Sequence, residues 1–185
     1  MRLARLWSRL GGDDAATLDT PGATRVLMVC MGNICRSPTA EVVLRHKLRD
    51  AGLHRRVAVD SAGMIDHHQG QPPDARAIRH AALRGYDLSV LRARAVVPVD
   101  FGRFDWMLAM DGDNLRWLRR QVPAGSAIQL ARLLEHAPEL GEVDVPDPYY
   151  GSPEGFERVL DLIEAGCDGF VRRLLASGLV EPARS

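Results

Sequence analysis

The chain has 185 residues, of which 46% are hydrophobic and 26% are charged, and its 24 Lys and Arg balance 24 Asp and Glu. This length allows one well-buried α/β or α+β domain and is short for two. A formal net charge of +0 without a long basic run argues against a dedicated nucleic-acid-binding protein, because phosphate neutralisation supplies most of that affinity.

Residues 1–23 are an N-terminal extension that differs from the rest of the chain. Apolar residues recur there at helical spacing, with arginines on the other side: Leu3, Leu6, Trp7 and Leu10. This pattern predicts a short amphipathic helix, and the Gly-containing stretch 11–24 is typical of a linker. We expect the helix to dock on its own domain or to fray, with a membrane surface or a partner protein as alternatives. No apolar signal-peptide core or cleavage site follows, so a cytoplasmic location is expected.

From Thr24 onward, predicted strands alternate with predicted helices. Short apolar, β-branched runs predict strands at 25–30, 57–63, 104–111 and 127–130. Helices are predicted from Ser37, as N-cap, to about 48, then at 73–83, 114–120, 132–136, and from 152–153 to about 174. Alternation of this kind implies an α/β domain over 24–180, with a parallel sheet covered by helices on both faces.

Membrane insertion and a disulfide framework are both disfavoured. No stretch reaches the roughly 18 consecutive apolar residues that a membrane-spanning helix needs. The chain has 3 cysteines, Cys30, Cys35 and Cys167, which are too few and too unevenly spaced for a disulfide framework. A reducing compartment is therefore expected, in which a reactive thiol would stay available.

The loop after the first predicted strand has the strongest chemical signal. In open sheets of this kind, ligands bind beyond the carboxyl ends of the strands. Cys30 stands at such an end, and the N-terminus of the following helix stabilises a thiolate through unpaired N–H groups and its dipole. Arg36 offers a fork of donors that matches two phosphoryl oxygens. The sequence therefore predicts a cysteine nucleophile within an anion-binding loop, whereas a lone cysteine at a strand end would more often serve packing.

The intervening residues suit a loop that curls around an anion. Backbone amides that can bind the anion come from Met31, Gly32, Asn33, Ile34 and Cys35. Gly32 and Asn33 are residue types that tolerate the left-handed backbone such a curl needs. Ser37 can donate to the sulfur of Cys30 and ease its departure from a phosphocysteine.

The segment VCMGNICRSPTAE, residues 29–41, resembles the signature of the low-molecular-weight protein tyrosine phosphatases. Further matches run along the chain to DVPDPYYG at 144–151, so the resemblance covers 24 to about 175. It implies a phosphotyrosine phosphatase I-like, flavodoxin-like domain with a four-stranded parallel sheet. It also implies hydrolysis of phosphotyrosine through a phosphocysteine on Cys30, with Arg36 binding phosphate and without a metal or other cofactor.

The resemblance assigns roles to residues beyond the loop. Asp147 matches the general acid that protonates the phenolate and later deprotonates water, although an Asp-Pro pair alone is more typical of a turn. Tyr149 and Tyr150 match an aromatic wall around the phenyl ring. Cys35 matches a cysteine that forms a reversible disulfide with the nucleophile, with simple packing as the alternative. Cys167 is expected in the core.

Two positions depart from the family pattern. His67 stands where an aromatic residue is common, which alters one pocket wall and leaves peptide preference open. Leu91 stands where histidine is common, and its presence predicts a looser network around Asn33 and Ser61. The histidines near His67 lack Cys or acidic neighbours in metal-binding spacing, so no metal site is expected.

Three other functions remain as alternatives. Arsenate reduction would need a downstream cysteine pair, and Cys167 is the only downstream cysteine. Phosphoarginine hydrolysis is associated with threonine at the position of Ile34. A phosphate-binding module without turnover is disfavoured by the presence of both Cys30 and Asp147. The expected partners are phosphotyrosine proteins; in bacteria such enzymes oppose tyrosine kinases of exopolysaccharide export or act on host proteins.

Overall fold

The computed structural model describes residues 15–151 and 153–178. In these ranges one parallel sheet contains β1 (Thr24–Cys30), β2 (Val57–Gly63), β3 (Trp106–Ala109) and β4 (Gln129–Arg132), in the order β2-β1-β3-β4. This confirms the expected four-stranded parallel sheet. The strand order reverses between β1 and β3, and that switch point is where ligands bind in doubly wound sheets.

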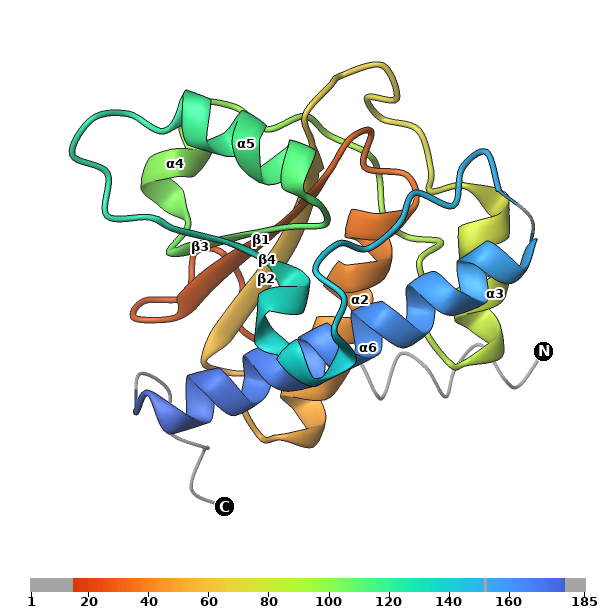
Figure 1. Ribbon diagram of the computed structural model, residues 1–185. Coiled ribbons are helices and arrows are strands. Elements are labelled where there is room, and N and C mark those ends of the chain that lie inside the picture. The colour runs from red at the N-terminus through yellow and green to blue at the C-terminus, as the bar shows by residue number, and fades with distance from the viewer. Residues whose placement is uncertain (1–14, 152, 179–185) are drawn as a thin grey trace.

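Helices cover both faces of the sheet (Figure 1). They are α2 (Arg36–Asp50), α3 (Ala75–Leu83), α4 (Asp100–Arg103), α5 (Gly112–Gln121) and α6 (Pro153–Ala176), with short 3₁₀ helices η1 (Leu133–His136) and η2 (Pro138–Leu140). α2, α3 and α6 lie on one side of the sheet, and α4 and α5 lie on the other.

Successive β1 residues pack into two separate cores. Val26 and Met28 face the core that is closed by α2 and α6. Leu27 and Val29 face the core that is closed by α4 and α5. All four side chains are fully buried, which explains why this strand appears in the sequence as a continuous apolar run.

Some predicted boundaries were wrong. α4 was not anticipated, because a helix of 4 residues is too short for a periodic pattern. The short helix near His136 is 3₁₀ in form, and β4 begins at Gln129 rather than 127. The helix after the loop begins at Arg36 with Cys35 as its N-cap, so Ser37 is not the cap. Its hydroxyl lies 3.0 Å from Cys30 Sγ instead.

The predicted amphipathic helix near the N-terminus lies outside the described residues. The described part of the expected linker, 15–23, lies against the domain. The Ala16 N–H donates to the His54 carbonyl at 2.7 Å, and Arg25 Nε donates to the Leu18 carbonyl at 2.8 Å. This part of the extension is therefore held by the domain.

α6 presents one apolar stripe to the core, as its periodicity predicts. The apolar residues that recur at helical spacing along it are all buried: Phe156, Val159, Leu160, Ile163, Cys167, Phe170, Val171 and Leu174. The helix approaches η1 so closely that a Cβ added at Gly169 would lie 1.7 Å from the His136 carbonyl oxygen. Among the helices of the described ranges, none has the length and apolar character needed to cross a bilayer.

Candidate active site

A pocket of about 230 Å³ opens at the C-terminal end of β1. It is lined by the loop after β1, the segment after β2 and the loop before α6: Cys30, Met31, Gly32, Ile34, Cys35, Arg36, Ile65, His67, His68, Asp147, Tyr149 and Tyr150. The fold thus brings Asp147 to Arg36 across 111 residues of sequence. Two predicted residues, Asn33 and Ser37, are not among the lining residues and are buried.

The backbone of the loop is shaped by one left-handed residue and two glycines. Asn33 has φ 55°, as expected of an asparagine in such a curl. Gly32 does not have a positive φ, so of these two tolerant residues Asn33 is the one that adopts the left-handed backbone. Its small size is required because a Cβ there would lie 2.9 Å from His68 Cδ2. Gly63, at the end of β2, similarly allows close approach, since its Cβ would lie 2.8 Å from the Met31 carbonyl oxygen.

Neighbouring segments bind the carbonyl oxygens of the loop. The Met64 N–H donates to the Cys30 carbonyl at 3.0 Å, and the Asp74 N–H donates to the Ile34 carbonyl at 2.8 Å. The carbonyl oxygens of Cys30 and Ile34 are therefore bonded to N–H groups outside the loop. The arrangement suits anion binding, because negative carbonyl ends are turned toward other partners.

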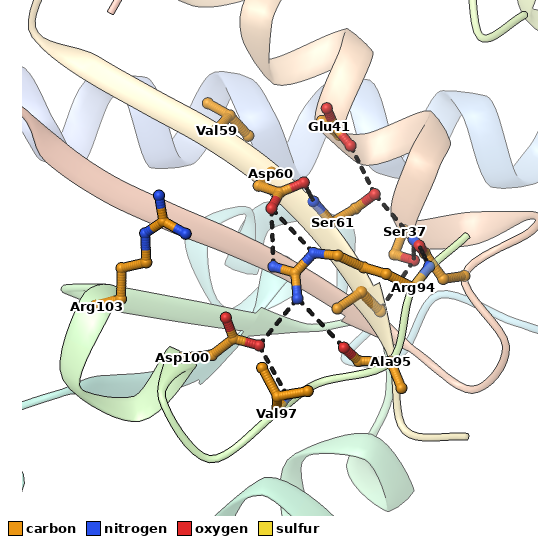
Figure 2. Close-up of polar contacts among 12 residues, drawn as sticks. Ser37, Glu41, Val59, Asp60, Ser61, Arg94, Ala95, Val97, Asp100 and Arg103 are labelled. Carbon is orange, nitrogen blue, oxygen red and sulfur yellow. Dashed lines mark hydrogen bonds and ion pairs between the residues drawn. The ribbon is translucent and has the colours of Figure 1, made fainter. Parts of the chain in front are cut away.

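Cys30 is 3% exposed and lies at one end of a polar network. Ser37 Oγ is 3.0 Å from its Sγ. Asn33 Nδ2 donates to the hydroxyls of both Ser37 and Ser61 at 2.8 Å. Asn33 Oδ1 accepts from the Arg94 N–H at 2.9 Å. Figure 2 shows Ser37, Ser61 and Arg94, which belong to this network. The network fixes the side chain of Asn33, the left-handed residue of the loop.

The network is complete although position 91 is a leucine. Leu91 is partly buried and packs against the apolar core. The side-chain amide of Asn33 is bonded through both its nitrogen and its oxygen. The structure therefore does not show the looser network that we expected from this departure.

The Arg36 guanidinium is 3% exposed and binds two carboxylates. Nη1 donates to Asp111 Oδ2 at 2.6 Å and to the Val145 carbonyl at 3.0 Å, and Nη2 donates to Asp147 Oδ2 at 2.8 Å. Burial alone would lower the pKa of Arg36, but the charges of Cys30, Asp147 and Asp111 outweigh burial and raise it. Arg36 is therefore a fixed cation in the pocket.

Asp111 is a site residue that the sequence did not single out. It follows β3, the strand next to β1, and its Oδ1 accepts from the Asn114 N–H at 2.7 Å as the N-cap of α5. The available signal was an N-capping aspartate directly after a predicted buried strand. Capping alone does not distinguish such a residue from many structural ones; the contact with Arg36 does.

The walls of the pocket combine phenol and imidazole rings. The ring of Tyr149 meets that of Tyr150 edge to face at 4.9 Å, and His67 meets His68 similarly at 4.8 Å. Tyr150 is 95% exposed, so Tyr149, at 37%, forms the more enclosed part of the wall. The Arg76 guanidinium lies 5.5 Å from the Tyr149 ring centroid. Within the described ranges, no cluster of potential metal ligands includes these histidines.

The three cysteines, Cys30, Cys35 and Cys167, form no disulfide. Cys35 is 6% exposed, and burial raises its pKa above the ordinary range, with further increases from Asp74 and Cys30. Cys35 is therefore a neutral thiol in the wall of the pocket. Cys167 is fully buried on α6, where its Sγ donates to the Ala40 carbonyl at 3.8 Å. It is a core residue, as expected.

The family model for low molecular weight phosphotyrosine protein phosphatase matches residues 25–178. A low molecular weight protein-tyrosine-phosphatase from Streptomyces coelicolor is 43% identical over 150 residues, which are 80% of this chain and 91% of the relative. A crystal structure of a protein tyrosine phosphatase from Entamoeba histolytica superposes with a TM-score of 0.81 at 35% identity, covering 84% of this chain and 99% of that one. A Drosophila arginine phosphatase superposes with a TM-score of 0.76 at 28% identity, covering 81% of this chain and 97% of that one.

Proposed function

This chain belongs to the low molecular weight phosphotyrosine protein phosphatase family, and from that premise we propose that it hydrolyses phosphotyrosine through a phosphocysteine on Cys30. One observation supports this proposal above others. Cys30, Arg36 and Asp147 line the same pocket, with the Arg36 guanidinium 2.8 Å from the Asp147 carboxylate. A nucleophile, a fixed cation and a proton donor are the groups that transfer of a phosphoryl group from a phenol requires.

In the first step, the thiolate of Cys30 attacks phosphorus. The S–P bond forms while the bond between phosphorus and the tyrosine oxygen breaks. Arg36 and the loop amides of Met31, Gly32, Asn33, Ile34 and Cys35 stabilise the equatorial oxygens, where negative charge gathers in the transition state. Asp147 gives its proton to the departing phenolate, so tyrosine leaves as a neutral phenol.

In the second step, water releases phosphate from the enzyme. The Asp147 carboxylate accepts a proton from water as the water oxygen attacks phosphorus. The S–P bond breaks, and its electron pair returns to Cys30 as a thiolate. The hydroxyl of Ser37, 3.0 Å from that sulfur, stabilises the leaving thiolate. Asp147 is then protonated again, and no step is assigned to a metal or cofactor.

The pocket lining favours an aryl phosphate as substrate. Tyr149 and Tyr150 would flank the phenyl ring on one side, and His67 would replace the usual aromatic residue of the other wall. Ile34 also lines the pocket, and its bulk favours a flat aryl group over phosphoarginine.

The proposed partners are proteins that contain phosphotyrosine. If the source cell is bacterial, a tyrosine kinase of exopolysaccharide export is a proposed substrate. Relatives occur in Streptomyces and in flies alike, so membership of the family does not by itself identify the source. We place the reaction in a reducing compartment such as the cytoplasm, where the Cys30 thiol would remain available.

A Cys30→Ser variant tests the nucleophile. We expect it to lose turnover of p-nitrophenyl phosphate and of a phosphotyrosine peptide while still binding inorganic phosphate. Normal turnover by this variant would refute the assignment. The wild-type protein should be compared on phosphotyrosine, phosphoserine and phosphoarginine peptides. Faster hydrolysis of phosphoarginine would replace the proposal with an arginine phosphatase.

An Asp147→Ala variant tests the proton donor. Its turnover should fall by about 10² to 10⁴ for phenols that leave poorly, because they need the proton most. The turnover of substrates whose phenols leave easily should fall less. Equal losses across a leaving-group series would indicate a structural aspartate.

A further inference from the structure

Glu41 is a buried carboxylate that the steps above do not use. It is 2% exposed on α2. The Ser61 hydroxyl donates to its Oε2 at 2.6 Å, and Arg45 Nη2 lies 2.6 Å from its Oε1. Figure 2 shows the Glu41 carboxylate directed toward the hydroxyl of Ser61. A buried charge is costly unless it is paired and hydrogen-bonded, so its position calls for a role.

Arg94 determines the orientation of the Asn33 amide. The Arg94 backbone N–H can only donate, so the group of Asn33 that faces it must be the oxygen. The Arg94 side chain is itself held by Asp60 at 2.8 Å and Asp100 at 3.0 Å (Figure 2). The Asn33 amino group must therefore face the hydroxyls of Ser37 and Ser61.

Each of these two hydroxyls accepts from Asn33 and has one proton left to donate. Ser61 donates its proton to the Glu41 carboxylate at 2.6 Å. For Ser37 the nearer acceptor is Cys30 Sγ at 3.0 Å, ahead of the Ala62 carbonyl at 3.3 Å. The network thus runs outward from Asn33 to two acceptors, one at Glu41 and one at Cys30.

We propose that Glu41 is a positioning residue for the phosphatase reaction: its carboxylate accepts the Ser61 proton, which fixes Asn33 in place and keeps the Ser37 proton directed at Cys30. The inference rests on the proposed function, because it concerns the thiolate of that mechanism. Glu41 touches neither the substrate nor Cys30. It acts through the hydrogen bonds of three intervening residues, Ser61, Asn33 and Ser37.

Arg45 favours the charged form of Glu41, which this role needs. The pKa of Glu41 is raised, with burial as the largest cause, while the charge of Arg45 and the hydrogen bond from Ser61 oppose that rise. Of the neighbouring charges, Asp60 raises this pKa and Arg94 lowers it. Arg45 is the part-exposed counterion, and it is also tied to the Val59 carbonyl at 2.8 Å.

The first test is Glu41→Gln, which keeps the shape of the side chain but replaces one acceptor oxygen of the carboxylate by an NH2 donor. The oxygen of a glutamine would face Arg45, so its amino group would face Ser61 and leave the Ser61 proton without an acceptor. The pH at which half of Cys30 reacts with iodoacetamide, followed by mass spectrometry of the Cys30 peptide, should rise by about one unit. The kcat should fall about tenfold at neutral pH.

Glu164→Gln is the matched control. Glu164 lies on α6, accepts from the Tyr86 hydroxyl at 3.0 Å and pairs with Arg84, so its printed partners lie outside the network of Asn33. Its replacement should leave both the alkylation midpoint and kcat at wild-type values. A folded Glu41→Gln protein with the same midpoint as this control would overturn the proposal. Alkylation needs no turnover, so this outcome is separate from a failure of the phosphatase assignment.

Arg45→Met provides a second test if Glu41→Gln does not fold. Without Arg45 the Glu41 carboxylate becomes protonated at higher pH, so the acid side of the kcat profile should shift to higher pH. A kcat profile that coincides with wild type would count against the inference. A thermal melt of each variant identifies the folded ones.

Discussion

The Arg36 guanidinium binds the Asp147 carboxylate, with Nη2 2.8 Å from Oδ2. These are the proposed phosphate ligand and the proposed general acid. The Arg36 side chain is 3% exposed and that of Asp147 is 41% exposed, so the loop before α6 approaches a fixed cation from the solvent side. Any anion that uses Nη2 must compete with this carboxylate.

Replacing Asp147 by Asn should therefore tighten the binding of inorganic phosphate. The amide has no charge to repel the anion, and it binds Arg36 more weakly. Because the pair is partly exposed, we expect a gain of roughly three- to fivefold in affinity, measured by isothermal titration calorimetry. Asp113→Asn is the control, since it removes a carboxylate that is paired with Arg116 on the surface of α5. Weaker phosphate binding by Asp147→Asn would show that the carboxylate does not compete.

Cys35 should protect Cys30 from irreversible oxidation. Hydrogen peroxide oxidises the Cys30 thiolate to a sulfenic acid and releases hydroxide; attack by the Cys35 thiol then forms a disulfide and releases water. Dithiothreitol should restore most activity to peroxide-treated wild type and much less to Cys35→Ser. Cys167→Ser should behave as wild type, because Cys167 lies in the core.

Burial raises the pKa of Cys35, so its thiolate is scarce near neutral pH. The disulfide should therefore form faster as pH rises, measured by mass spectrometry after rapid quenching with an alkylating agent. Equal recovery of the wild-type and Cys35→Ser proteins would leave Cys35 with a packing role alone.

His136 should make the fold sensitive to acid. Desolvation lowers its pKa to about 4, whereas an unfolded histidine titrates near 6.5. As pH falls from about 6.5 to about 4, the unfolded histidine binds a proton while the folded one does not. The contribution of neutral His136 to stability is therefore fully present above pH about 6.5 and is lost as pH falls through about 4. Over that window the free energy of unfolding should fall by about 3 kcal/mol because of this group.

His136→Phe should flatten this pH dependence. The substitution keeps a ring beside Phe170, 5.0 Å away, and Trp106, 6.0 Å away. Urea unfolding at pH 4 and pH 7 measures the difference between the two proteins. The same loss of stability in both would exclude His136 as its source.

Gly169→Ala should destabilise the fold strongly. The added Cβ would meet the His136 carbonyl oxygen at 1.7 Å, so α6 must move away from η1. We expect a loss of more than about 3 kcal/mol in the free energy of unfolding. Gly102→Ala is the matched control, since a Cβ there meets nothing within 4 Å. Similar melting temperatures for the two variants would contradict the packing described for α6.

The contiguous loop Cys30 to Ser37 was predictable from the sequence because its chemistry depends on near neighbours. A strand end, a left-handed asparagine, a fork of donors and a helix start all lie within 8 residues. β1 and β3 were also predictable, since strands that are buried on both faces form nearly continuous apolar runs in the sequence. β4 was less well placed, because its edge position leaves Gln129 exposed and weakens the apolar pattern.

The sequence by itself determined the fold class, the position of the proposed nucleophilic loop and the residue types available to it. Only the tertiary structure decided which groups meet: Asp111 and Asp147 at Arg36, and Glu41 behind Ser61. The physical reason is that these contacts join positions 20 to 111 residues apart. Such contacts follow from the strand order and from close approaches at glycines, and local periodicity encodes neither.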